Sequence, residues 1–115
     1  MIQQPTIDNS RDNLITNFGK AVLKDRYMVP KEKSPQEALA RAAVAFAASD
    51  AHAKRLYDYA SKLWFMFATP ILSNGGTDRG LPISCFLNYV PDSREGLCEH
   101  YLENIWLSSS GGGIG

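Results

Sequence analysis

The sequence predicts a mainly helical N-terminal domain that leads into the beginning of an α/β structure. Two observations carry this expectation: apolar residues recur at helical spacing through the first half of the chain, and an alternating stretch follows at residues 83–90. The composition suits a folded chain, because 44% of the 115 residues are hydrophobic and 21% are charged. Residues 1–10 show neither pattern and are expected to form a flexible arm.

Two helices are expected before residue 49. The first covers residues 12–28, with apolar side chains on one face (Leu14, Ile15, Phe18, Ala21 and Val22), and Pro30 and the charged run after it end the segment. Ser34 begins the second, with a proline in the first turn and Glu37 where a capping box needs it. This helix is expected to continue to Ala48, with Leu39, Ala43 and Phe46 on its buried face.

A third helix is expected to begin at Ser49-Asp50 and to continue until Pro70 stops it. Its predicted buried stripe consists of Leu56, Tyr59, Leu63 and Phe67. The last two turns, residues 63–67, are apolar nearly all round, so protein is expected to enclose them on several sides. Residues 73–76 then have the composition of a turn.

The second half is expected to contain one strand and one helix. Residues 83–90 read as a strand in which Cys85 shares a face with Ile83, Leu87 and Tyr89. Asp92-Ser93 caps a helix that runs to about Leu107, with Leu97, Tyr101 and Ile105 as its stripe. One strand cannot make a sheet, and both it and the apolar end of the third helix lack partners in this chain. The sequence is therefore expected to be a fragment, or half of a two-chain assembly.

Charge and composition exclude several classes of protein. Twelve basic and twelve acidic residues give no long-range attraction to nucleic acid or an anionic membrane. No apolar stretch could span a bilayer, and the first residues do not resemble a signal peptide, so a cytoplasmic location is expected. Cys85 and Cys98 form neither a disulfide framework nor a metal cluster, and His52 and His100 are expected to be solvated or packed histidines.

Five places could carry chemistry, and each also has an ordinary structural interpretation. The glycine-rich residues 108–115 could point amides at a phosphate or form a flexible end, but they lack the lysine of a Walker motif. Thr69 and Ser84 could donate to an anion or make ordinary polar contacts. Cys85 is either a buried inert thiol or a redox thiol, and Asp92 either a helix cap or a ligand of a ribose hydroxyl.

Four blocks of sequence together resemble the catalytic subunit of ribonucleotide reductases. They are ATPILSNGGT at 68–77, ISCFL at 83–87, Asp92-Ser93, and SSGGGIG at 109–115. Residues 18–27 and 34–37 resemble the helical start of that subunit, so the resemblance covers about residues 11–115, with wording most similar to phage-encoded members. It implies a helical domain over residues 11–72 and the truncated start of a ten-stranded α/β barrel over residues 73–115, with residues 83–89 as its first strand.

The resemblance assigns the substrate chemistry to particular residues. Cys85 matches the cysteine that helps to reduce the ribose 2′ position and ends in a disulfide with a cysteine beyond this chain, so Cys98 is not its partner. Thr69 and Ser84 match residues that hold the substrate's phosphates. The implied reaction replaces the 2′-hydroxyl by hydrogen in a ribonucleoside-diphosphate reductase, with a triphosphate substrate left as an alternative.

The resemblance also assigns binding roles and partners. Gly112 and Gly113 match positions that line the substrate's ribose and base. Asp92 and Ser93 match the specificity site, where a deoxynucleoside triphosphate effector selects the substrate, and the helix after them matches one that packs across the interface of a homodimer. The other implied partners are the C-terminal remainder of the subunit and a radical-generating small subunit.

No cofactor or metal is expected on this chain itself. A metal-bearing small subunit or adenosylcobalamin would supply the radical, and a thioredoxin-type reductant the electrons. The radical cysteine and the second redox thiol are expected downstream, and residues 1–10 leave no room for an ATP-cone. Two other functions stay open from the residues alone: a non-catalytic nucleotide-binding module and a small helical interaction protein.

Overall fold

The computed structural model describes all residues 1–115 and divides into two compact units, Met1–Pro82 and Ile83–Gly115. The first unit contains the 3-10 helix η1 (Asn9–Leu14) and the α-helices α1 (Asn17–Arg26), α2 (Pro35–Ala45), α3 (Asp50–Ser61) and α4 (Thr69–Asn74). This confirms the prediction of a mainly helical N-terminal part. No helix combines the length and the apolar character that crossing a bilayer would need.

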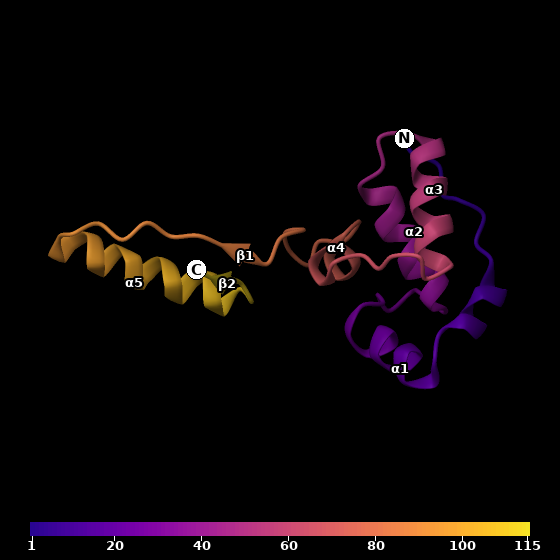
Figure 1. Cartoon of the computed structure of the whole chain (residues 1–115), viewed down its shortest axis with the longest axis horizontal. Coiled ribbons are helices and arrows are strands. Elements are labelled where there is room, and N and C mark those ends of the chain that lie inside the picture. The colour runs from indigo at the N-terminus through magenta and orange to yellow at the C-terminus, as the bar shows by residue number, and fades with distance from the viewer. The chain divides into compact units, whose positions relative to one another are not determined.

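Helix α2 forms the centre of the first unit and contacts η1, α1, α3 and α4. Figure 1 shows α2 and α3 side by side. The alanines of α2 are favourable in a helix and small enough to allow close approach of its neighbours. The buried core consists of Leu23, Ala38, Leu39, Ala40, Ala42, Ala43, Tyr57, Ala60 and Leu72.

The start of the chain differs from the single helix expected over residues 12–28. The helix is interrupted because the Thr16 hydroxyl accepts a hydrogen bond from the Gly19 amide at 3.1 Å and so caps a new helix, α1. Leu14 and Phe18, which were expected on the buried face, are 53% and 80% exposed, and Leu23 is buried instead. The predicted apolar face was therefore wrong at Leu14 and Phe18, whereas Ile15 packs partly buried against the core as expected.

The first ten residues, expected to form a flexible arm, make specific hydrogen bonds to α3. The backbone amide of Gln3 donates to the Asp50 carboxylate at 2.9 Å, and that of Asp8 donates to the Tyr57 hydroxyl at 2.8 Å. The Tyr57 hydroxyl in turn donates to buried Gln36 at 3.2 Å. The bond from Tyr57 pairs the side-chain oxygen of Gln36, and the side-chain nitrogen of Gln36 donates to the Asp12 carboxylate at 2.9 Å, which explains how Gln36 is accommodated in the core.

Helix α2 begins where the sequence predicts, but its cap is built differently. Ser34 donates its hydroxyl proton to Asn9 at 3.0 Å and makes no side-chain cap bond to α2. The Glu37 carboxylate accepts from the Lys33 amide at 2.8 Å, one residue before the position that a capping box uses. The helix ends at Ala45, before the expected Ala48.

Helix α3 ends at Ser61, so the prediction that it continues to Pro70 was wrong. The Leu63 amide donates to the Ala60 carbonyl and the Trp64 amide to the Tyr59 carbonyl, both at 3.0 Å, which is the hydrogen-bond pattern of a Schellman C-cap. Leu63 occupies the left-handed position of this motif with φ 60°. The Trp64 ring stacks on Tyr59 with 5.1 Å between centroids, the apolar contact that often accompanies this cap.

The early end of α3 also changes which residues are buried. The buried residues of the helix are Ala53, Tyr57, Ala60 and Ser61. Of the predicted stripe, Leu56 and Phe67 pack partly buried against the core, whereas Tyr59 and Leu63 are exposed. Residues 63–66 are exposed within this chain, so the expected enclosure of the apolar end does not occur here. Thr69 and Pro70 begin α4, because the fixed φ of proline fits a first helical turn.

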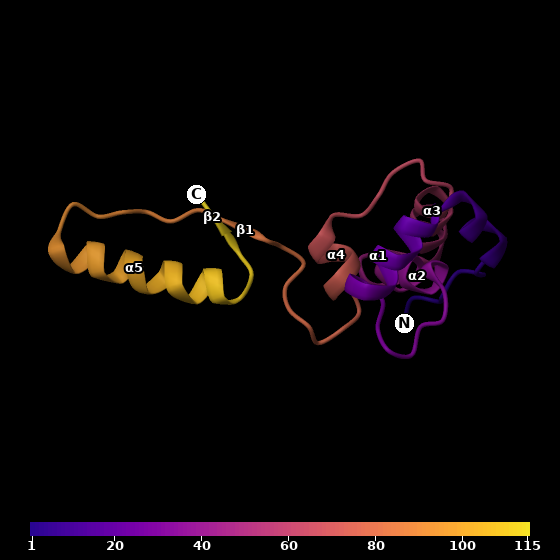
Figure 2. The ribbon, with the colours of Figure 1, turned by 90° about the horizontal axis from the view of Figure 1, so that it is seen from below.

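The second unit is a strand–helix–strand arrangement made of β1 (Cys85–Phe86), α5 (Arg94–Ser109) and β2 (Gly113–Ile114). The two strands are parallel, with Cys85 opposite Gly113 and Phe86 opposite Ile114. Both lie at the C-terminal end of α5, and the segment between β1 and α5 runs back along the helix (Figure 2). The expectation that the strand lacks a partner in this chain was therefore wrong, and the barrel itself stays a prediction.

The paired part of the predicted strand is short, and α5 is largely exposed. Asn88 donates to the Asn104 side chain at 2.9 Å, and Asn104 lies 2.9 Å from the Nε2 atom of His100. The predicted stripe of α5 is not buried, since Leu97, Tyr101 and Ile105 are 44%, 66% and 66% exposed. Side-chain amides and backbone hydrogen bonds, more than an apolar core, thus hold this unit together.

Candidate functional site

Four of the predicted site residues lie together where β1 meets β2. Cys85 and Gly113 face each other across the parallel pair, and the Gly113 amide donates to the Ser84 carbonyl at 2.6 Å. The Ser84 hydroxyl lies 3.8 Å from the Cys85 sulfur. Gly112 completes this cluster by packing against Phe86 of β1.

The C-terminal end of α5 delivers the glycine-rich segment to β1. Gly111 has φ +83° and donates to the Ser108 carbonyl at 3.0 Å, while Gly112 donates to the Leu107 carbonyl at 2.9 Å. This is a second Schellman motif, here with the glycine that its left-handed position favours. A Cβ on Gly112 would lie 2.8 Å from the Phe86 ring and 3.0 Å from the Leu107 carbonyl oxygen. Glycine at residue 112 therefore allows the close approach of loop and strand.

The amides of this glycine segment are already used within the chain. Besides those of Gly111, Gly112 and Gly113, the Gly115 amide donates to the Phe86 carbonyl at 2.9 Å. These four amides therefore do not form a free cradle for phosphate, which was one interpretation of the segment. What the arrangement offers is an exposed thiol on the strand that pairs with the glycine segment.

The Cys85 thiol is free and exposed, so the interpretation of Cys85 as a buried residue was wrong, and its redox role stays a prediction. An accessible thiol can undergo disulfide exchange when a second thiol reaches it. Cys98 is also free and exposed, on α5, and the two cysteines are not bonded to each other. No three or more His, Cys, Asp or Glu side chains gather closely enough to hold a metal ion.

The predicted effector residues lie at the opposite end of α5 from the glycine segment. Ser93 caps the helix, since its hydroxyl accepts from the Gly96 amide at 3.0 Å, and Asp92 is exposed beside it. Helix α5 has 16 residues. At about 1.5 Å per residue its ends are roughly 24 Å apart. Asp92 and Ser93 are thus separated from Cys85, Gly112 and Gly113 by the length of the helix.

Thr69 lies in the first unit, as the first residue of α4, and its side chain is exposed. Its hydroxyl lies 3.2 Å from the Tyr27 hydroxyl, which follows the end of α1. The sequence analysis did not identify Tyr27 as a site residue. Tyr27 lies in residues 18–27, which resemble the helical start of the catalytic subunit, but nothing in that stretch indicates a chemical role. Only the fold brings these two hydroxyls together.

Arg41 connects three segments of the first unit and was also missed. Its guanidinium donates to the Glu32 carboxylate at 2.7 Å, to the Tyr27 carbonyl at 3.1 Å and to the Gly75 carbonyl. The Arg41 and Glu32 side chains are only 11% and 6% exposed. This buried ion pair fixes the end of α1 and the end of α4 against α2.

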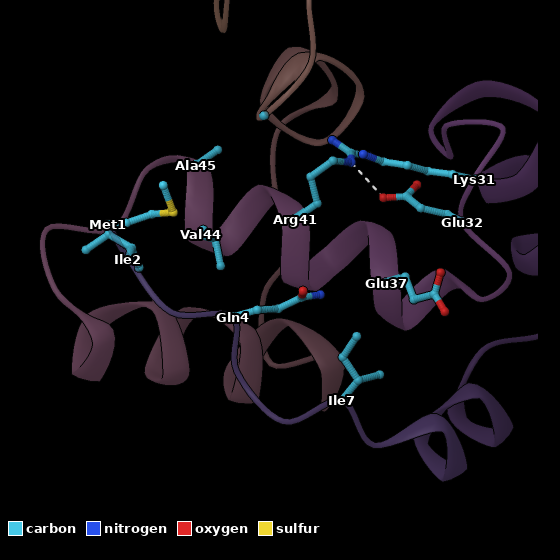
Figure 3. A pocket seen from close by; sticks show the side chains of 11 residues that line it. Met1, Ile2, Gln4, Ile7, Lys31, Glu32, Glu37, Arg41, Val44 and Ala45 are labelled. Carbon is cyan, nitrogen blue, oxygen red and sulfur yellow. Dashed lines mark hydrogen bonds and ion pairs between the residues drawn. The ribbon is translucent and has the colours of Figure 1, made fainter.

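A cavity of about 670 Å³ lies beside this ion pair, between the N-terminal arm and α2. Figure 3 shows Met1 and Ile2 near Val44 at one part of the cavity, with the Arg41–Glu32 pair at another. None of the predicted site residues lines it. The cavity therefore contributes nothing to the site around Cys85.

Two carboxylates have shifted pKa values, and both belong to an ion-pair network between η1 and α3. The hydrogen bond from Ser10 is the main cause that lowers the pKa of Asp8 from its ordinary value of 3.8. The hydrogen bond from Lys62 is the main cause for Asp58, followed by that from Arg11. Arg11 lies 3.2 Å from Asp8 and 2.9 Å from Asp58, so these shifts accompany a structural contact.

Known proteins resemble this chain over most of its length. The family described as "Ribonucleotide reductase, all-alpha domain" matches residues 13–80, more than half of the sequence. The ribonucleoside-diphosphate reductase large subunit of Invertebrate iridescent virus 3 is 50% identical over 111 residues, which cover 96% of this chain and 18% of that protein. The corresponding protein of Invertebrate iridescent virus 6 is 43% identical over 109 residues, covering 95% and 11%.

A bacterial relative extends the likeness beyond viruses. The ribonucleoside-diphosphate reductase subunit alpha of Helicobacter pylori is 31% identical over 118 residues, covering 95% of this chain and 15% of that protein. The chain spans less than a fifth of the length of each of these three relatives. The chain belongs to the ribonucleotide reductase large-subunit family, whose all-alpha domain it carries at residues 13–80.

Proposed function

We propose that this chain supplies the N-terminal part of the large subunit of a ribonucleoside-diphosphate reductase, which makes deoxyribonucleotides for DNA synthesis. The names of its relatives support the class of enzyme. The single observation that carries the assignment of the site is the pairing of Cys85 with Gly113, because it sets an accessible thiol beside the glycine segment. Gly113 is exposed, so a ribose could approach its backbone without meeting a side chain there.

The proposed chemistry uses Cys85 as one of two reducing thiols. The ribose 2′ carbon–oxygen bond breaks, the oxygen leaves as water, and a carbon–hydrogen bond replaces it. Two thiols supply the two electrons and two protons and become a disulfide, so one further cysteine from the remainder of the subunit is required. A metal-bearing small subunit or adenosylcobalamin supplies the radical that starts the reaction, and a thioredoxin-type reductant restores the thiols.

The binding roles proposed for the other residues follow their resemblance to the family's substrate-binding positions. The hydroxyls of Thr69 and Ser84 donate to the substrate's phosphates, and both side chains are exposed. Gly112 and Gly113 line the ribose and base beside the thiol. A diphosphate substrate agrees with the names of the relatives.

The effector site is proposed at the other end of α5. Asp92 and Ser93 bind a deoxynucleoside triphosphate there, so an effector acts on the substrate over the roughly 24 Å of the helix. The exposed apolar side chains of α5, such as Tyr101 and Trp106, are 66% and 67% exposed and suit a protein interface. We assign this interface to the homodimer of the complete subunit.

Reconstitution tests the proposed function. The chain alone, given substrate, effector, reductant and a radical source, should form no deoxynucleotide, whereas the same chain joined to the remainder of the large subunit should do so. Turnover by the chain alone would contradict the proposal. Nucleotide binding by the reassembled subunit without any turnover that depends on Cys85 would favour a non-catalytic binding module, and a stable monomer that ignores nucleotides would favour a helical interaction protein.

A further inference from the structure

The hydroxyls of Tyr27 and Thr69 form an isolated pair in the first unit. Their oxygens lie 3.2 Å apart, and neither hydroxyl has another hydrogen-bond partner in the chain. The nearby Ser73 hydroxyl donates to the Thr69 backbone carbonyl at 2.8 Å and so leaves the Thr69 side chain available. Tyr27 is therefore the one group of this chain that can orient the Thr69 hydroxyl.

The backbone around this pair is fixed at both ends of α4. Thr69 begins the helix beside Tyr27, and Gly75 ends it. Arg41 donates to the Gly75 carbonyl and, at 3.1 Å, to the Tyr27 carbonyl, while Glu32 holds the guanidinium at 2.7 Å. Arg41 thus links the Tyr27 backbone to the end of α4, while the Tyr27 side chain contacts the start of the same helix. These contacts hold the Tyr27 and Thr69 hydroxyls close to each other.

The direction of the hydrogen bond follows from the number of protons. A threonine hydroxyl has one proton to donate and two lone pairs that accept. An ionised phosphate oxygen carries no proton and can only accept a hydrogen bond, so the Thr69 hydroxyl must donate to it. The Tyr27 hydroxyl must then donate to Thr69, and each bond polarises the next.

We propose that Tyr27 is a positioning residue for the substrate's phosphate and acts by directing the Thr69 hydroxyl proton toward it. This inference rests on the proposed contact between Thr69 and the substrate. In the absence of Tyr27, the Thr69 hydroxyl rotates freely and loses the donor that polarises it. Tyr27 should therefore affect the binding of substrate and leave the reduction of the bound ribose unchanged.

The test measures KM and kcat for ribonucleotide reduction by the complete large subunit that carries this chain. Tyr27→Phe should raise KM about three- to tenfold, the scale of one neutral hydrogen bond, with kcat unchanged. The same substitution should have this effect in a Thr69→Ser background, which keeps the hydroxyl, and no effect in a Thr69→Val background. Tyr59→Phe is the matched control, because the Tyr59 ring stacks on Trp64 and its hydroxyl has no partner.

The outcomes separate the inference from the proposed function. If Thr69→Val leaves KM unchanged, Thr69 does not contact the substrate and the proposed function fails at this residue. If Thr69→Val raises KM but Tyr27→Phe does not, or if Tyr27→Phe still raises KM in the Thr69→Val background, the positioning role is overturned. Loss of folded protein would lower the active fraction and apparent kcat and leave KM unchanged, so a folding defect cannot imitate the expected result.

Discussion

Removal of the Arg41 guanidinium should strongly destabilise the helical unit. Arg41→Met leaves the Glu32 carboxylate, only 6% exposed, with the Val29 amide as its remaining partner at 2.8 Å. Breaking a buried ion pair on one side typically costs about 3–5 kcal/mol, because the remaining charge stays desolvated. Small domains are stable by only about 5–15 kcal/mol, so the variant should be close to unfolding.

Urea unfolding followed by far-UV circular dichroism measures this cost. With a slope of about 2 kcal/mol per molar urea, the midpoint should fall by roughly 2 M. The double variant Arg41→Met with Glu32→Leu should lose less than Arg41→Met alone, because no charge is left buried. Arg26→Met is the control, since Arg26 and Asp25 are 76% and 78% exposed and their pairing at 3.6 Å should contribute little. Equal urea midpoints for Arg41→Met and Arg26→Met would show that the buried Arg41–Glu32 pair matters no more to stability than an exposed pair.

Three further changes test particular features. Leu63→Gly should raise the free energy of unfolding by about 1 kcal/mol, because glycine relieves the left-handed strain, and a loss in urea unfolding would contradict this. The Lys62 hydrogen bond lowers the pKa of Asp58 in the folded chain, so its stabilisation is present above pH 3.8 and is lost as pH falls through the lowered pKa. Asp58→Asn should therefore reduce the acid sensitivity of unfolding, and unchanged sensitivity would argue against the shift. Gly112→Ala should speed hydrogen exchange of the Gly113 amide by separating β2 from β1, and unchanged exchange would show that the loop tolerates a Cβ.

Local sequence signals predicted the starts of helices better than their ends. Ser34-Pro35 and Ser93 were identified correctly as helix starts because caps are local chemistry. The end of α3 was missed because Leu63 occupies a position that usually favours glycine, and no sequence pattern announced it. The buried stripe of α3 was predicted to include Leu56, one position before Tyr57. Tyr57 is the residue that is buried, and it donates a hydrogen bond to Gln36 in the core.

The pairing of β1 with β2 could not be predicted from local pattern either. Gly113-Ile114 is only two residues long and is surrounded by glycines, so the sequence does not indicate a strand there. Cys85 was therefore expected to have no partner strand in this chain. The sequence did identify Cys85 and Gly113 separately, through resemblance. Their direct opposition, like the contact between Tyr27 and Thr69, depends on segments that are distant along the chain.

Cys85 is proposed to supply one of the two thiols that reduce the ribose. The most direct measurement compares repeated turnover with substrate binding for Cys85→Ser in the complete reductase, with thioredoxin-type reductant present and Cys98→Ser as the matched control. A serine hydroxyl cannot form the disulfide that stores the two electrons. Cys85→Ser should bind substrate normally but lose multiple turnover, while Cys98→Ser should retain it. Full multiple turnover by Cys85→Ser would show that the thiol is structural and has no part in the reduction.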